Sequence, residues 1–325
     1  MPMTSKGWTW IISALVGAGY GLIVRAVVTL HVMNTAWFEI MSCAFIFGVP
    51  VALGFVSIWL GTDEKRFGWL SCIFAPWIAA GLFLVGALAL AWEGIICIII
   101  WLPLVLILST FGGLLAGICH RMLKAKRNRN LCVAIFALLP LVAGPVERFV
   151  TVPPEIRDVQ TEIKIHASPS TVWNEIKTVR MIEDREQSFS FTHLMGLPRP
   201  REAKLVGEGV GAVRYASFDK GVLFVETITE WDEGHRLEFT IRADTEHIPP
   251  NTFDEHVIVG GRYFDVLTGT YWIEPVSGGD VILHLSSSQR LSTHFNFYSH
   301  HWTEWMMADL QNYILAIIKR RCEVV

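Results

Sequence analysis

An acidic side chain, Asp309, lies inside an aromatic run near the end of the chain. It follows Trp305 by four residues and precedes Tyr313 by four, and with Trp302 and Tyr298 it falls on one stripe of an α-helix. If that stripe faces a hydrophobic hollow, the carboxyl group could bind a polar headgroup. It could also act as a general acid or base with a raised pKa. If Asp309 lies at the edge of the stripe, it faces water instead.

Arg214 and Glu226 are charged residues in otherwise apolar, strand-like segments. On adjacent strands they would pair inside a cavity. Period-two alternation also gives a strand a polar face, however, and this favours solvent exposure. The candidate ligand-binding set therefore comprises Arg214, Glu226, Tyr298, Trp302, Trp305, Asp309 and Tyr313.

Residues typical of metal or cofactor sites are sparse. His294, His300 and His301 cluster, but neighbours on a helix point about 100° apart, so the two adjacent histidines do not easily share one ion. Gly207 and Gly209 precede a strand rather than opening a helix, so they do not form a phosphate-binding loop. We predict no metal site and no cofactor, and an enzymatic activity is left open.

The elements that position these residues begin at 159–167, where apolar and polar residues alternate as in a half-buried strand. Ser168 then caps a helix, with Pro169 at its first position. A second helix is expected within 180–190. A short strand before Gly207, strands at 212–218, 222–231, 235–243, 262–274 and 281–290, and a long amphipathic helix at 299–321 follow.

This order predicts an α+β helix-grip domain at 151–325, in which a curved antiparallel sheet is closed by the C-terminal helix. Hairpin turns are expected at 219–221, 232–234 and 277–279. The connection 244–261 is long for a hairpin and predicts a lid over the cavity mouth.

Four stretches match, in order, the elements of one known type of domain. IKIHASPSTVWNEI at 163–176 resembles the opening of such a domain. GEGVGAVRYASF and GVLFVETITEWDEGHRLEFTI resemble its central strands, and EWMMADLQNYILAIIKRR resembles its closing helix. Together these stretches resemble the START-like, or SRPBCC, superfamily, which includes polyketide cyclases and lipid-transfer domains. The resemblance spans about 155–321 and implies a hydrophobic cavity that holds a lipid, a sterol or a polyketide-like ligand.

Residues 1–150 predict an all-α transmembrane region. Four runs, 8–30, 38–60, 70–92 and 95–119, are long and apolar enough to span a bilayer. A fifth run, 131–150, contains Pro140 and is the least regular, so four or five helices are expected. Glycines spaced four apart, Gly17 with Gly21 and Gly113 with Gly117, favour close helix packing.

Charge is divided unevenly along the chain. The region 1–150 has a net charge of +5 and 151–325 has −8, which argues against nucleic acid as a partner. Lys and Arg gather in the N-terminal segment, at 65–66 and at 121–129, which lie on one side if the spans alternate. We expect an integral membrane protein of a bacterial cytoplasmic membrane, with its N-terminus inside and the second domain extracytoplasmic if all five runs cross.

Arg25, Glu39 and Glu93 are charged residues close to expected span ends. Charges within a membrane are functional candidates, but near an end they can snorkel to the interface, and this explanation is favoured.

The sequence thus predicts membrane-tethered binding or transfer of a lipid or other hydrophobic molecule. The alternatives are a cyclase or hydratase that uses Asp309, and a sensor or assembly module that packs on partner membrane proteins. Aromatic residues near the start of the last helix could line a cavity or rest in the bilayer interface, but at helical spacing a core role is favoured. They are Phe295, Phe297, Tyr298, Trp302 and Trp305.

Overall fold

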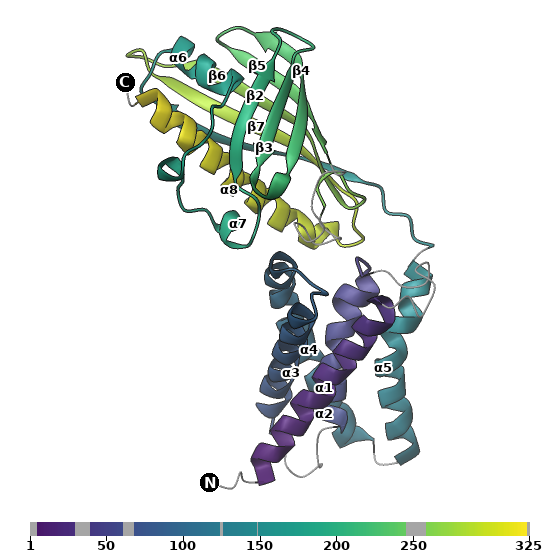
Figure 1. Ribbon diagram of the computed structural model, residues 1–325. Helices are drawn as coiled ribbons and strands as arrows, with labels where there is room; N and C mark the ends of the chain where they lie inside the picture. The colour runs from purple at the N-terminus through teal and green to yellow at the C-terminus, as the bar shows by residue number, and fades with distance from the viewer. Residues whose placement is uncertain are drawn as a thin grey trace. The chain divides into compact units, whose positions relative to one another are not determined.

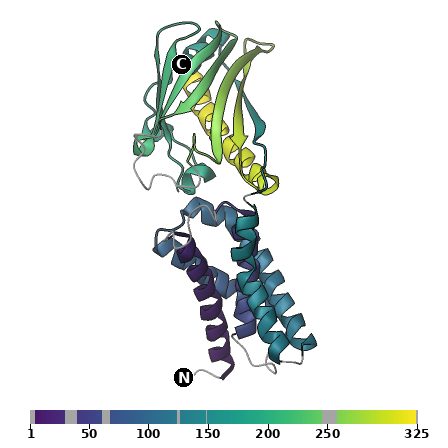
Figure 2. The same cartoon turned by 90° about the vertical axis from the view of Figure 1, so that its right-hand side faces the viewer.

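The computed structural model describes residues 5–29, 40–60, 68–123, 126–147, 149–244 and 258–323. The chain forms two compact units, Met1–Val152 and Pro153–Val325. The first consists of helices and the second is built on a sheet (Figures 1 and 2). The expected lid at 244–261 falls largely outside the described residues.

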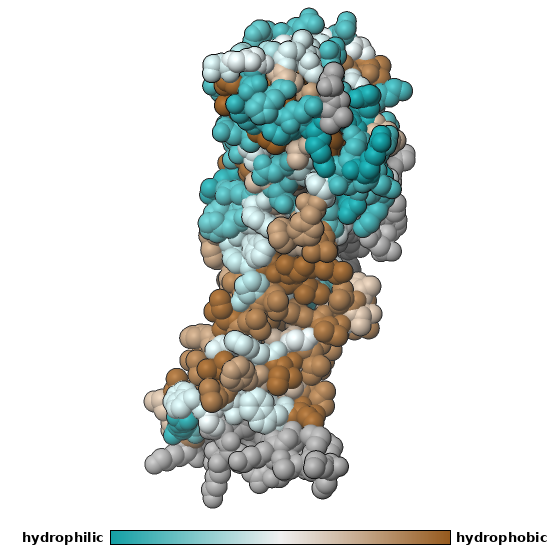
Figure 3. Space-filling model, turned by 90° about the vertical axis from the view of Figure 1, so that its left-hand side faces the viewer, coloured by the Kyte–Doolittle hydropathy of each residue, from teal (hydrophilic) through white to brown (hydrophobic). Residues whose placement is uncertain are grey.

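Among its described residues, the first unit has five α-helices of 12 residues or more. They are α1 (Ser5–Thr29), α2 (Val49–Leu60), α3 (Ser71–Ala89), α4 (Ile95–Met122) and α5 (Lys126–Glu147), with the π-helix η1 (Ala44–Gly48) leading into α2. Among the described residues, four helices are long and apolar enough to cross a membrane, and α5 is one of them. The segment Ala44–Leu60 is shorter. Figure 3 shows one face of the molecule, on which the surface of these helices is mostly hydrophobic.

The start of α2 is held by side chains from two other helices. Pro50 has no N–H to donate to the carbonyl of Ile46, and Trp101 Nε1 of α4 donates to that oxygen instead, at 2.9 Å. The carboxylate of Glu147 on α5 accepts the backbone N–H groups of Cys43 at 2.7 Å and Ala44 at 3.0 Å. A carboxylate at a helix N-terminus satisfies donors that the helix itself leaves unpaired.

Arg25 and Glu93 form a buried ion pair, so the snorkelling explanation is wrong for both. Their Nε and Oε1 atoms are 2.8 Å apart, and the side chains are 3% and 6% exposed. Arg25 also donates to the carbonyl of Trp92. The pair joins the end of α1 to the α3–α4 connection, and it replaces water with internal partners at both charges. Glu39 lies outside the described residues.

The second unit is the α+β helix-grip that the sequence predicts. Seven antiparallel strands lie in the order β1-β7-β6-β5-β4-β3-β2. The strands are β1 (Glu155–Ile165), β2 (Pro200–Val206), β3 (Val213–Phe218), β4 (Leu223–Asp232), β5 (Arg236–Ala243), β6 (Phe264–Pro275) and β7 (Val281–Leu291). After β1 comes α6 (Pro169–Lys177), and the chain ends in α8 (Asn296–Glu323), which lies across the sheet (Figure 1).

The helix α8 is fixed to the sheet by Gln311 and by an apolar face. Gln311 Nε2 donates to the carbonyl of Val159 and to Ser287 Oγ, both at 3.0 Å, and its Oε1 accepts from Thr161 at 3.0 Å. Leu315, Ile318 and other apolar side chains of α8 complete the core with β1, β6 and β7. The Gln311 amide and this apolar face together position α8 on β1 and β7.

The α6–β2 connection differs from the expectation. Ser168 caps α6 by accepting from the N–H of Thr171, as predicted. The expected second helix at 180–190 is wrong, because within this described stretch the chain forms only the 3-10 turn Asp184–Glu186. One further turn, α7 (Phe191–Leu194), follows. Its four residues are too few for a periodic apolar signal.

Candidate functional site

Arg214 and Glu226 lie opposite each other on β3 and β4 and form a buried ion pair on the inner face of the sheet. The residues are 3% and 6% exposed. Arg214 Nη1 also donates to the carbonyl of Ile176 at the end of α6, at 2.7 Å. The solvent-facing alternative is therefore wrong. Both positions lie six residues from Lys220 in the β3–β4 turn, and this symmetry could have predicted that they face each other.

Aromatic rings surround the guanidinium group of Arg214. Its Cζ lies 4.3 Å from the ring centre of Phe239 and 5.7 Å from that of Tyr271. Phe239 occupies this position because Gly269 on β6 has no side chain, since a Cβ there would lie 2.6 Å from the ring. Burial raises the pKa of Glu226, and the charge of Arg214 only partly offsets this effect. The pair is thus a desolvated polar group surrounded by apolar side chains.

The inner face beside this pair is apolar and only partly covered. The helix α8 packs mainly on β1 and β7. Phe224 on β4 and Ile241 on β5, which flank Glu226, remain only half-buried. Near Arg214, α6 covers part of this face, and Ile241 packs at the border of the core. Strands β4 and β5 therefore offer partly exposed apolar side chains beside one buried ion pair.

The aromatic stripe of α8 packs on the α6–β2 connection rather than on the sheet. Tyr313 is buried against Ile182, and its ring centre lies 4.5 Å from that of His193. Trp305 contacts Phe191 with ring centres 6.1 Å apart. The stripe continues along α8 in half-buried Trp302 and Tyr298, whose ring centres are 6.5 Å apart.

The seven predicted residues consequently occupy two places. Arg214 and Glu226 lie on the inner face of the sheet, whereas the other five lie on the α8 stripe. Sequence reasoning missed Phe239 and Tyr271 as neighbours of Arg214. Alternation in β5 and β6 puts both on the inner face, but only the strand register reveals which side chain they meet.

Asp309 is an acceptor at the beginning of α7. Its Oδ2 atom accepts from Ser190 Oγ at 2.6 Å, from Thr192 Oγ1 at 2.8 Å and from the N–H of Thr192 at 3.1 Å. Burial acts to raise the pKa of Asp309, but these hydrogen bonds outweigh burial and lower it. The raised pKa that an acid–base role would need is therefore not found, and these hydrogen bonds favour the charged carboxylate of Asp309.

We predict that Asp309→Ala loosens the α7 corner. Hydrogen bonds to a charged group are worth about 1.5–3 kcal/mol, so hydrogen exchange of the Thr192 amide should accelerate strongly. The lowered pKa means that the stabilisation is present above the ordinary value of 3.8 and is lost as pH falls below it. Asn312→Ala, on the exposed side of α8, is the matched control. Equal exchange in both variants would show that Asp309 does not hold the corner.

The chain matches no protein-family model and none of the curated proteins. Among solved structures it is similar to a protein from Thermus thermophilus, with 18% identity and a TM-score of 0.33 over 51% of this chain and 97% of that one. It is also similar to truncated norcoclaurine synthase from Thalictrum flavum, with 16% identity and a TM-score of 0.32 over 54% of this chain and 99% of that one. Neither likeness transfers an activity or a ligand to this chain.

Proposed function

We propose that this chain is a membrane-anchored protein whose second unit binds a lipid or another hydrophobic small molecule against the inner face of its sheet. The observation that carries the proposal is the half-buried apolar surface at Phe224 and Ile241, next to the buried pair of Arg214 and Glu226. An apolar ligand would cover the hydrophobic side chains. A polar headgroup would meet the ion pair, which supplies both a cation and an anion for hydrogen bonding.

The short connection between the two units supports a ligand that comes from the bilayer. Seven residues, 148–154, join the end of α5 to the start of β1. At no more than about 3.6 Å per residue, the connection can span at most about 30 Å between the end of α5 and the start of β1. A tethered binding site of this kind experiences a high effective concentration of anything dissolved in the membrane.

Exposed aromatic side chains around α7 support the same source. Phe189 is 70% exposed, Phe191 is 53% exposed, and Trp305 on α8 is 42% exposed. Neighbouring rings touch, with centres 4.8 Å apart for the two phenylalanines. Aromatic rings of this type favour the membrane interface, so this surface would hold the domain against lipid.

The orientation in the membrane is part of the proposal. With α1 to α5 all crossing, the Lys- and Arg-rich connection at 121–129 would be cytoplasmic and the second unit extracytoplasmic. An enzyme built on Asp309 is less favoured. Its carboxylate is occupied by Ser190 and Thr192, and its low pKa suits an acceptor rather than a proton donor.

The test is native mass spectrometry of the full chain extracted from its own membrane. We expect a bound hydrophobic molecule in the wild type and a clear loss of occupancy in Ile241→Trp, which fills the inner face. Tyr215→Trp, on the exposed side of β3, should keep the ligand. The proposal would be contradicted by a wild-type protein without ligand, or by equal occupancy in the two variants.

A further inference from the structure

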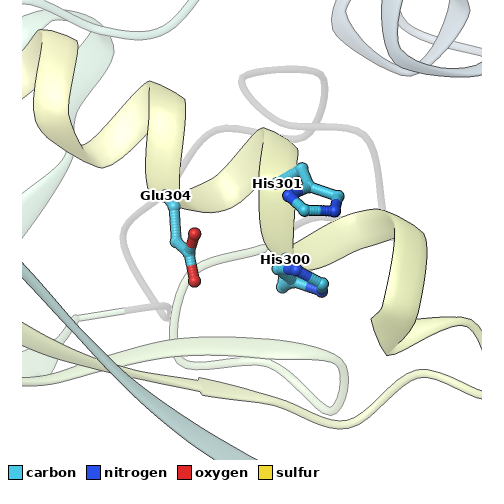
Figure 4. Close-up of side chains that lie close together, drawn as sticks. All are labelled: His300, His301 and Glu304. Carbon is cyan, nitrogen blue, oxygen red and sulfur yellow. The ribbon is translucent and has the colours of Figure 1, made fainter.

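Three potential metal ligands meet near the beginning of α8. His300, His301 and Glu304 each offer a ligand atom, and these atoms lie within 4.8 Å of one another. Figure 4 shows the two histidines side by side on α8, with Glu304 one turn further along the helix. The cluster is separate from the inner face of β3 to β5 and from the α7 corner. It is half-buried at His300 and Glu304 and exposed at His301.

The spacing explains how adjacent histidines contribute to one cluster. Glu304 is four residues after His300 and three after His301, and both spacings bring side chains together on a helix surface. The centres of the two imidazole rings are 3.8 Å apart. Adjacent backbone positions lie about 100° apart around the helix, but the two histidine side chains converge here, and the carboxylate lies beside both.

His300 has the hydrogen bond that commonly orients a metal-binding imidazole. Its Nδ1 lies 2.7 Å from the carbonyl oxygen of Asn296. A carbonyl oxygen only accepts, so Nδ1 carries the hydrogen and Nε2 presents its lone pair. Metal-ligating histidines usually donate their second nitrogen to a carbonyl or carboxylate in this way.

Glu304 is also held in place by a second residue. Its Oε1 atom lies 3.3 Å from Nη1 of Arg157 on β1, and Arg157 is paired in addition with Glu155. One oxygen of Glu304 is thereby fixed to the sheet edge, and the other is available to an ion. Among these three groups two carboxylates face one guanidinium, and this balance favours a cation.

We propose that His300, His301 and Glu304 form a binding site for Zn²⁺, with a fourth position open to water or to an external ligand. Two imidazoles and one carboxylate suit Zn²⁺ well. Bond lengths of about 2.0–2.2 Å place tetrahedral donors about 3.4 Å apart. The present ligand atoms lie up to 4.8 Å apart, and rotation of the exposed His301 ring can bring them closer. This site does not depend on the proposed ligand at the inner face.

The test uses the full chain in detergent, without a polyhistidine tag, titrated with Zn²⁺ by calorimetry. Loss of an outer-shell partner weakens metal binding about 10–100-fold, so loss of a direct ligand in His301→Ala or Glu304→Gln should weaken it at least about tenfold. His166→Ala is the matched control, because His166 is an exposed histidine that pairs with Asp280 outside the cluster. This variant should bind as the wild type does.

Co²⁺ substitution separates this site from the six cysteines of the chain. We expect visible ligand-field bands without the charge-transfer band of a thiolate ligand, and loss of these bands in both variants. Three results would overturn the site: no saturable binding, unchanged affinity in His301→Ala and Glu304→Gln, or a dominant thiolate band.

Discussion

Replacing Arg214 by methionine should destabilise the second unit by about 3–5 kcal/mol, because it leaves the carboxylate of Glu226 buried without its partner. The cation also packs on the ring of Phe239 and donates to the carbonyl of Ile176, so three interactions are lost together. Arg242→Met is the control. It removes an arginine at an exposed position on β5 and should change the free energy of unfolding little.

Lowering the pH should reduce the loss of stability that Arg214→Met causes. Burial raises the pKa of Glu226 in the folded state above its value of 4.5 in the unfolded chain, and removing the cation raises it further. A carboxyl group whose pKa is raised in the folded state contributes stability that is fully present below pH 4.5. This stability is lost as the pH rises through the pKa of the folded state. The variant should therefore be most stable at mildly acidic pH and weaken towards neutrality. In the double variant Arg214→Met with Glu226→Leu, stability should largely return.

Cys322 offers a direct readout of these changes. It is the single cysteine in 151–325, it is 3% exposed, and it lies in the core cluster that α8 shares with the sheet. Thiol labelling at Cys322, followed by peptide mass spectrometry, reports how often this core opens in the intact protein. Equal labelling rates for wild type and Arg214→Met at neutral pH would contradict the role given to the pair.

Gly112→Ala should disrupt the packing of the first unit. A Cβ at Gly112 would lie 2.0 Å from the carbonyl oxygen of Val51, and one at Gly54 would lie 2.0 Å from that of Ser109. The backbones of α2 and α4 therefore touch, and even a methyl group must push the helices apart. Overpacking a well-fitted site costs about 1–3 kcal/mol, and contact with a backbone atom puts this substitution at the upper end.

The matched control is Gly81→Ala on α3, where an added Cβ meets nothing within 4 Å. Thermal stability of the full chain in detergent, measured by size-exclusion chromatography after heating, should fall markedly for Gly112→Ala and not for Gly81→Ala. If both variants withstood heating like the wild type, the close contact of α2 and α4 would not be required.

Local patterns predicted much of the second unit. The alternation at 159–167 became β1, Ser168 capped α6, and the expected turns contain glycines with positive φ, such as Gly221 and Gly234. These features depend on neighbours in sequence. The first unit was also predictable as apolar helices, because hydropathy is a local property, and the Gly17 and Gly113 positions do lie in close contacts.

Long-range pairings were not predictable in the same way. Hydropathy cannot reveal that Arg25 meets Glu93, which lies 68 positions later in the chain. The wide apolar face of α8 touches two different partners, the sheet through Leu315 and the α6–β2 connection through Tyr313. That connection forms only single helical turns, so its sequence carries no periodic signal to indicate which stripe it would cover.

The most direct test of the central claim is to photo-crosslink the bound molecule from inside the sheet. A small diazirine-bearing amino acid at position 241 should form adducts with a hydrophobic molecule in membranes. The same group at position 215, on the other side of β3, should yield far fewer adducts. Lipid or other hydrophobic adducts confined to position 241 are the result we predict. Equal adducts at both positions, or none at position 241, would contradict ligand binding by the inner face.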